Sequence, residues 1–180
     1  MNAKSLLNSF LAAKCTKRIT IIFIWLLLLV FGQLNAAIRY VNINASGTGS
    51  GTSWTNAYTN FKTAMDAAVS GDEVWVAKGT YLAAIGTSFS MKDGVKIYGG
   101  FNGGEGTLNV RNWQNNITIL SGNSSRVLYN STLSSTALLD GFTITGSGGG
   151  WAGIDNRYAS PTLQNLKITK NLGAGINVQT

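Results

Sequence analysis

Residues 139–145 read LDGFTIT and residues 163–169 read LQNLKIT, so one pattern of apolar, polar and turn residues returns after 24 positions. The triplet AGI recurs in the same way at residues 152–154 and 174–176, after 22 positions. A period in this range is typical of stacked repeats. Each unit holds short alternating strands separated by Gly and Asn turns, which predicts repeats of 22–24 residues built from strands.

The alternation begins well upstream of this internal copy. Val74, Val95 and Ile117 each open a short alternating strand, at spacings of 21 and 22 residues. We predict that these three residues occupy equivalent positions in successive repeats.

Other repeat proteins fit this sequence less well. Leucine-rich repeats share the period but need a regular Leu lattice, and tetratricopeptide and ankyrin units need recurring helices; the sequence has neither feature. Short strands with small residues at the corners instead favour an all-β fold, a parallel β-helix whose coils stack about 4.8 Å apart.

A single segment has helical periodicity. Residues 54–68 place apolar side chains at steps of three and four, followed by Gly71, and Ser53, Thr55 or Asn56 could cap the start. We expect an amphipathic helix that covers the open first coil of the β-helix, where strand edges would otherwise be exposed.

The N-terminal segment has the composition of a secretory leader. Residues 1–18 are basic, residues 19–31 are apolar apart from Thr20, and small residues follow. The apolar run is too short to span a bilayer, which argues against the alternative of a membrane anchor. We predict a signal peptide at residues 1–36 and a mature domain at 37–180. The mature chain is then secreted or at the cell surface, with no stable membrane span.

Charge and composition exclude several functions. Four of the 14 basic residues lie in the leader, which leaves ten scattered bases against seven acids and gives no support for nucleic-acid binding. The chain has no histidine and its one cysteine, Cys15, precedes the apolar run. We therefore expect no metal and no cofactor.

The acidic residues offer no catalytic constellation. Polysaccharide lyases and hydrolases need clustered or paired carboxylates, but only Asp72 and Glu73 are neighbours, and consecutive strand residues point apart. Asp140 matches Gln164 in the next repeat, and the next repeat places Asn177 beside Asp155. We expect amide ladders at these positions rather than an acid pair, and no catalytic residue in the chain.

Three aromatic residues lie in or beside predicted loops: Trp113, Trp151 and Tyr158. A flat ring on a rigid scaffold can stack on a sugar, so these residues are the candidates for glycan contact. The alternative is that they cover the flank of the β-helix.

Several segments carry a family resemblance: residues 54–58 (WTNAY), 64–68 (AMDAA), 71–81 (GDEVWVAKGTY) and 94–101 (GVKIYGGF). Together they resemble the start of secreted right-handed β-helix proteins of Bacteroidetes type. These belong to the pectate-lyase-like superfamily and are similar to chlamydial polymorphic membrane proteins. Such proteins continue for many more coils, often to a C-terminal sorting domain, so the resemblance implies that this chain is an N-terminal fragment.

These observations predict an exported, non-catalytic β-helix protein that acts as an adhesin or a glycan-binding scaffold. Its partners would be polysaccharides or glycans of a host or cell surface. The alternative is the N-terminal part of an extracellular polysaccharide lyase or glycoside hydrolase whose active site lies beyond residue 180.

Overall fold

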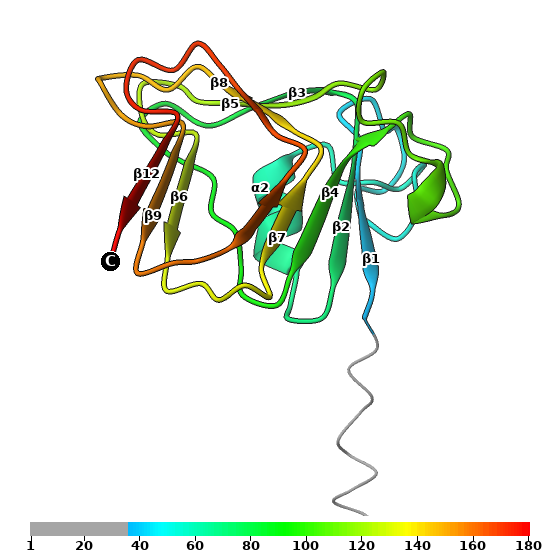
Figure 1. The fold of residues 1–180 in the computed structure, drawn as a ribbon. Helices are drawn as coiled ribbons and strands as arrows, with labels where there is room; N and C mark the ends of the chain where they lie inside the picture. The colour runs from blue at the N-terminus through cyan, green and yellow to red at the C-terminus, as the bar shows by residue number, and fades with distance from the viewer. Residues whose placement is uncertain (1–35) are drawn as a thin grey trace, which may run out of the picture. The chain divides into compact units, whose positions relative to one another are not determined.

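The computed structural model describes residues 36–180, which consist mainly of β-strands in parallel sheets (Figure 1). This part of the chain has one short α-helix, α2 (Phe61–Ala67), and one 3-10 helix, η1 (Leu108–Val110). Neither has the length and hydrophobicity that a bilayer crossing requires. The signal peptide predicted at residues 1–36 lies outside the described residues, apart from Ala36.

The strands form three sheets, which we call A, B and C. Sheet A has the order β1 (Ile38–Val41), β2 (Glu73–Ala77), β4 (Lys96–Phe101), β7 (Leu138–Asp140), β10 (Thr162–Gln164). Sheet B has the order β11 (Lys167–Ile168), β8 (Thr143–Thr145), β5 (Thr118–Ser121), β3 (Gly79–Leu82). Sheet C has the order β12 (Ile176–Gln179), β9 (Ile154–Arg157), β6 (Leu128–Ser131).

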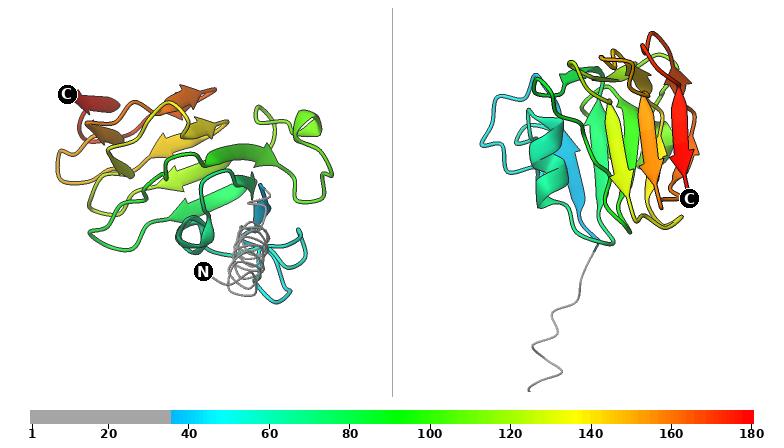
Figure 2. Two further views of the ribbon diagram at one scale, coloured as in Figure 1. Left: turned by 90° about the horizontal axis from the view of Figure 1, so that it is seen from below. Right: turned by 90° about the vertical axis from the view of Figure 1, so that its left-hand side faces the viewer.

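The chain passes through the three sheets in a fixed order. β4, β5 and β6 lie in sheets A, B and C, and β7 to β9 and then β10 to β12 repeat this order. All pairings between these strands are parallel, and Figure 2 shows the strands of a sheet side by side. The all-β, parallel and repeat-like character predicted from the sequence is therefore present.

The strand register confirms the internal copy found in the sequence. Leu163 pairs with Leu139 in sheet A, and Ile168 pairs with Ile144 in sheet B, which is the alignment of the two longer segments. Ile176 pairs with Ile154 in sheet C, which is the alignment of the two AGI triplets. The repeat length of 22–24 residues is thus the number of residues between paired positions in these neighbouring strands of one sheet.

The equivalence proposed for Val74, Val95 and Ile117 is wrong. Val74 pairs with Ile97, and Ile97 pairs with Leu139 across sheet A. Ile117 directly precedes β5, which belongs to sheet B. Residues 102–117 form a long loop between β4 and β5, so the spacing from Val95 to Ile117 does not mark a repeat.

Apolar side chains stack in columns on the inner faces of the sheets. The column in sheet A consists of Val74, Ile97, Leu139 and Leu163. The column in sheet B consists of Tyr81, Leu120, Ile144 and Ile168. Most of these residues belong to one buried core, whose burial is the main source of stability for such a fold.

The outer face of sheet A is also buried near its first strands. The Trp75 ring stacks on Phe101 with centroids 4.7 Å apart, and Trp54 packs beside Phe101 at 5.3 Å. The Trp54 indole N–H donates to the carbonyl of Glu105 at 2.8 Å. Aromatic pairs of this kind add to the free energy gained from area burial.

The predicted helix over residues 54–68 is much shorter in the structure. α2 begins at Phe61, and its N-cap is Asn60 rather than Ser53, Thr55 or Asn56. The Asn60 side-chain oxygen accepts the backbone N–H of Thr63 at 3.2 Å. The segment before α2 consists of bends and a turn and is held to β1 at Tyr58, whose N–H donates to the Tyr40 carbonyl and whose carbonyl accepts from the Asn42 N–H, both at 2.9 Å. Tertiary pairing here overrides helical periodicity.

This segment and α2 together cover the free edge of β1. Tyr40 N–H also donates to the Gly51 carbonyl at 2.9 Å, so β1 has partners on both sides. Phe61, Ala64 and Met65 of α2 belong to the main core. The predicted N-terminal cover therefore exists, but much of it consists of bends and turns rather than helix.

Asp72 connects this cover to the first strands. Its carboxylate accepts the N–H groups of Ala37 at 3.0 Å and Val69 at 3.1 Å, and the Arg39 Nε–H at 3.0 Å. Burial alone would raise the pKa of Asp72, but the two backbone amides and the guanidinium hold it below its usual value. Glu73 instead accepts the indole N–H of Trp75 at 2.8 Å, so both acids have structural partners.

Replacing Asp72 by Asn should lower the free energy of unfolding by about 1–3 kcal/mol, because buried donors lose a charged acceptor. Urea unfolding followed by circular dichroism at neutral pH measures this change. The matched control is Asp66→Asn, whose side chain is 63% exposed and pairs only with Lys62. That control should cost less than about 0.5 kcal/mol.

Acidification of the unmodified protein should remove the contribution of the Asp72 carboxylate to the free energy of unfolding. Because the folded-state pKa of Asp72 lies below its ordinary value of 3.8, its stabilisation is complete above that value. It is lost as the pH falls through the folded pKa. Between about pH 5 and about pH 2, the unmodified protein should lose more stability than Asp72→Asn. Parallel losses in the two proteins would contradict this account.

Candidate functional site

The long loop between β4 and β5 carries Trp113 and is held by its own polar groups. The Glu105 carboxylate accepts the backbone N–H groups of Asn102 at 2.5 Å and of Gly103 and Gly104 at 2.9 Å. Partial burial would raise the pKa of Glu105, but these amides outweigh it and lower the pKa. A carboxylate bound in this way fixes the start of the loop.

Arg111 ties the loop to sheet A. Its Nη1 donates to the Gly99 carbonyl at 2.8 Å, and its Nη2 donates to Asp140 Oδ2 at 2.5 Å. The guanidinium lies 5.3 Å from the ring centre of Tyr98. Both members of the ion pair are largely buried, so this contact positions the loop and is not free for a ligand.

Two glycines allow the loop to lie directly on the sheet. Gly100 has φ +92°, and a Cβ there would lie 2.4 Å from the Cα of Trp113. Gly141 has φ +84°, and a Cβ there would lie 2.7 Å from Nη1 of Arg111 and 3.0 Å from the Cβ of Trp113. The absence of side chains at both positions sets the height of Trp113 above the strands.

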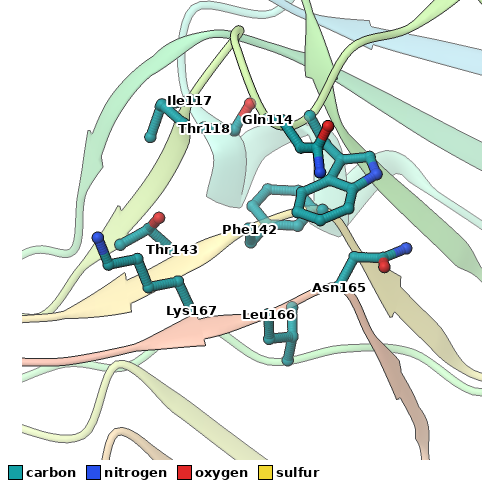
Figure 3. Close-up of a pocket in the computed structure, with 10 residues that line it drawn as sticks. Gln114, Ile117, Thr118, Phe142, Thr143, Asn165, Leu166 and Lys167 are labelled. Atoms are coloured by element: carbon teal, nitrogen blue, oxygen red, sulfur yellow. The ribbon is translucent and has the colours of Figure 1, made fainter.

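A hollow of about 360 Å³ lies beside Trp113 where the chain turns from sheet A into sheet B. Its lining is Trp113, Gln114, Ile117, Thr118, Gly141, Phe142, Thr143, Asn165, Leu166 and Lys167. Figure 3 shows Phe142 near the centre, between Gln114 on one side and Leu166 on the other. We call this space the first hollow.

A second hollow of about 380 Å³ is lined by Leu108, Asn109, Arg111 and Trp113. Trp113 is the residue that lines both hollows. Each volume falls in the range of small-molecule sites. An extended ligand could therefore pass across Trp113 from one hollow to the other.

The first hollow combines apolar surface with hydrogen-bonding groups and one cation. Gln114 and Asn165 supply amides, Thr143 supplies a hydroxyl, and Lys167 supplies the charge. No carboxylate of the described residues lines either hollow. This arrangement can bind a polyhydroxylated ligand, but it lacks the acid pair that glycoside hydrolysis needs.

The acids of residues 36–180 are all engaged by the chain itself. Each of the seven accepts at least one hydrogen bond from another protein group: Asp66, Asp72, Glu73, Asp93, Glu105, Asp140 and Asp155. In the same residues, no three His, Cys, Asp or Glu side chains lie close enough together to hold a metal ion. These carboxylates are therefore committed to structural contacts.

The three aromatic candidates do not form one site. Trp113 lies at the junction of sheets A and B, whereas Trp151 lies beside sheet C under the guanidinium of Arg126, 3.7 Å from the ring centre. Tyr158 directly follows β9, is 73% exposed and has φ +48°. Of the three, Trp113 is the one surrounded by amide and hydroxyl groups.

The predicted amide ladders are present in part. Asn177 Nδ2 donates to Asp155 Oδ1 at 2.9 Å, as expected from their pairing. Asp140 pairs in register with Gln164, but its Oδ1 accepts instead from Asn165 at 2.7 Å. The turn residue thus displaces the strand residue as the partner.

Sequence reasoning missed Gln114, Asn165 and Lys167 as residues of the site. A signal was available for Asn165, which aligns with Gly141 in the internal copy and shares its left-handed backbone, with φ +48°. Asn tolerates this conformation better than most residues. Such a turn position places a polar side chain at the corner between two sheets.

Comparisons with known proteins place the chain in a family. Neither the curated proteins nor the solved structures contain a match to it. A family model with the description "Protein of unknown function (DUF1565)" matches residues 43–180, which include all strands from β2 onward. Since the match covers well over half of its length, the chain belongs to the DUF1565 family.

Proposed function

We propose that this protein is an exported, non-catalytic glycan-binding scaffold, in which a right-handed parallel β-helix presents Trp113 to an extended saccharide. The fixed passage through sheets A, B and C and the in-register pairing of the internal copies support the β-helix. The basic and apolar leader supports export to the cell surface or the medium.

The position of Trp113 between two hollows is the observation that carries this proposal. A saccharide has apolar C–H faces and hydroxyl edges, so it suits a flat ring flanked by amide and hydroxyl groups. Gln114 and Asn165 are placed to receive such edges in the first hollow. Because the Trp113 loop packs directly on Gly100 and Gly141, little conformational entropy should be lost when a ligand binds.

The state of the acids favours binding over cleavage. Glu105 lies within this loop and accepts three of its backbone amides. Asp140 is bonded to the loop through Arg111, and both of its oxygens already accept hydrogen bonds, from Arg111 and Asn165. Acid–base catalysis needs a carboxylate free to exchange a proton with the substrate. The residues around Trp113 supply recognition without that group.

Replacing Trp113 by Ala should weaken saccharide binding by at least about tenfold, since a central aromatic contact is lost. Affinity electrophoresis in neutral and acidic plant and bacterial polysaccharides identifies a retained ligand. Isothermal titration calorimetry then gives its affinity. Trp113→Phe keeps a flat ring and should retain most of the binding.

Tyr158→Ala is the matched control, because it removes an exposed aromatic ring that lines neither hollow. Its affinity should stay within about twofold of the unmodified protein. The proposal fails if no polysaccharide retards the protein. It also fails if Trp113→Ala binds the retained one as well as the unmodified protein does.

The glycine support gives a separate prediction. Gly100→Ala should lower the melting temperature and weaken saccharide binding, because the new Cβ would push against the backbone of Trp113 and the φ of +92° disfavours alanine. Gly104→Ala lies in the same loop with no atom within 4 Å of its Cβ and should change neither property. Equal behaviour of the two variants would refute this account of the loop.

A further inference from the structure

The outer face of sheet C carries a second cluster of charged and aromatic residues, separate from the Trp113 hollows. The strand register places Tyr129, Asp155 and Asn177 in one outward column. The neighbouring column contains Ser131, Arg157 and Gln179. Arg126 and Trp151 lie over these columns and complete the cluster.

Arg126 is fully engaged within this cluster. Its Nε donates to Asp155 Oδ2, and its guanidinium stacks on Trp151 at 3.7 Å and lies 5.1 Å from the centre of Tyr129. Cation–π contacts of this kind hold an arginine in one orientation. The side chain is only 16% exposed, so Arg126 is a structural residue.

Both oxygens of Asp155 already accept hydrogen bonds. Oδ2 accepts from Arg126, and Oδ1 accepts the Asn177 amide at 2.9 Å. Burial would raise the pKa of Asp155, but Asn177, Arg126 and Arg157 lower it, so the carboxylate is ionised at neutral pH. The cluster therefore holds two positive charges and one negative charge.

Arg157 is the second cation of the cluster; it forms a longer ion pair with Asp155 and lies 5.7 Å from the ring centre of Tyr129. Its Nε lies 3.6 Å from Asp155 Oδ2, beyond hydrogen-bond reach, and this buried N–H has no acceptor within the described part of the chain. Leaving a buried donor unsatisfied is costly, which is why such donors are usually paired. The side chain as a whole is 37% exposed, so an external acceptor can reach the exposed atoms of the guanidinium, which do not include the buried Nε.

A hollow of about 270 Å³ opens at this arginine. Trp151, Asp155, Asn177 and Gln179 line it together with Arg157. The Asp155 carboxylate at this hollow is paired with Arg126, which leaves Arg157 as the second cation of the cluster. Asn177 uses its N–H group on Asp155, while Gln179 is exposed and can donate to a ligand. The planar fork of an arginine is suited to the oxygens of a carboxylate or a sulfate.

We propose that Arg157 and Gln179 bind the anionic group of an acidic polysaccharide on the outer face of sheet C, with Trp151 at the edge of the sugar ring. The anionic group is a carboxylate, as in a uronic acid, or a sulfate ester, and both offer the same fork of oxygens. This site lies on a different sheet from Trp113 and does not depend on the function proposed there.

The full chain should be titrated with polygalacturonate, with dextran sulfate and with uncharged dextran, using isothermal titration calorimetry. We expect binding of at least one charged polymer, and Arg157→Gln should weaken that binding by about tenfold or more. Lys170→Gln is the matched control, because it removes the same charge from an exposed side chain that lines none of the three hollows. It should change the affinity by less than about twofold.

Acidity distinguishes the two sources of the anionic group. Binding through a uronate carboxylate should weaken as the pH falls below about 4, where carboxylates protonate. Binding through a sulfate should persist at that pH. Either result supports the anion site, provided that the binding also depends on Arg157.

Arg157→Gln leaves the shorter Arg126–Asp155 pair intact and removes only the longer Arg157–Asp155 pair, so the variant should keep the circular dichroism spectrum and lose at most a few degrees of melting temperature. The proposal is overturned if neither charged polymer binds, or if Arg157→Gln and Lys170→Gln lose equal affinity. The result for Trp113→Ala does not bear on the Arg157 site, because the two sites are tested with different variants. Failure of the function proposed for Trp113 can therefore be distinguished from failure of the anion site.

Discussion

Parallel pairing in register between strands of successive repeats is the constraint on which the rest of this structure depends. In such pairing each residue lies directly beside its counterpart in the next strand, so a position is apolar throughout a column or its polar groups must satisfy one another. The inner columns are apolar, as in Leu120, Ile144 and Ile168. One inner exception, Asn130 beside Asn156, is satisfied by a hydrogen bond of 2.9 Å.

The same constraint places the candidate sites at corners and outer faces. Inner positions are filled by the core, so a ligand can meet only turns, inserted loops and outward columns. The inserted loop of residues 102–117 lies over Gly100 and Gly141. Neither glycine has a side chain, so Trp113 can approach the backbone at both positions. Arg157 is an outward strand residue and owes its position to the register of sheet C.

Charge is distributed by a recurring arrangement in which an arginine from one segment meets an aspartate of a sheet. Arg39 pairs with Asp72, Arg111 with Asp140, and Arg126 with Asp155, always over a long stretch of chain. Because these pairs use the buried acids, the surfaces left for ligands carry amides, aromatic rings and partly exposed cations. This distribution favours recognition of hydroxyl-rich or acidic ligands over carboxylate catalysis.

The sequence by itself determined the strand repeat, the apolar and polar columns, the structural use of Asp72 and Glu73, and the pairing of Asp155 with Asn177. These features follow from alternation within strands and from the internal copy of whole strands, both of which are patterns visible along the chain. Only the tertiary structure decided that residues 54–58 are not helical, because pairing of Tyr58 with β1 competes with helix formation there. It also decided which aromatic residue lines the two hollows at the sheet A–B corner and which arginine is left without an acceptor. Such properties depend on contacts between distant segments, and no local pattern in a single chain encodes them.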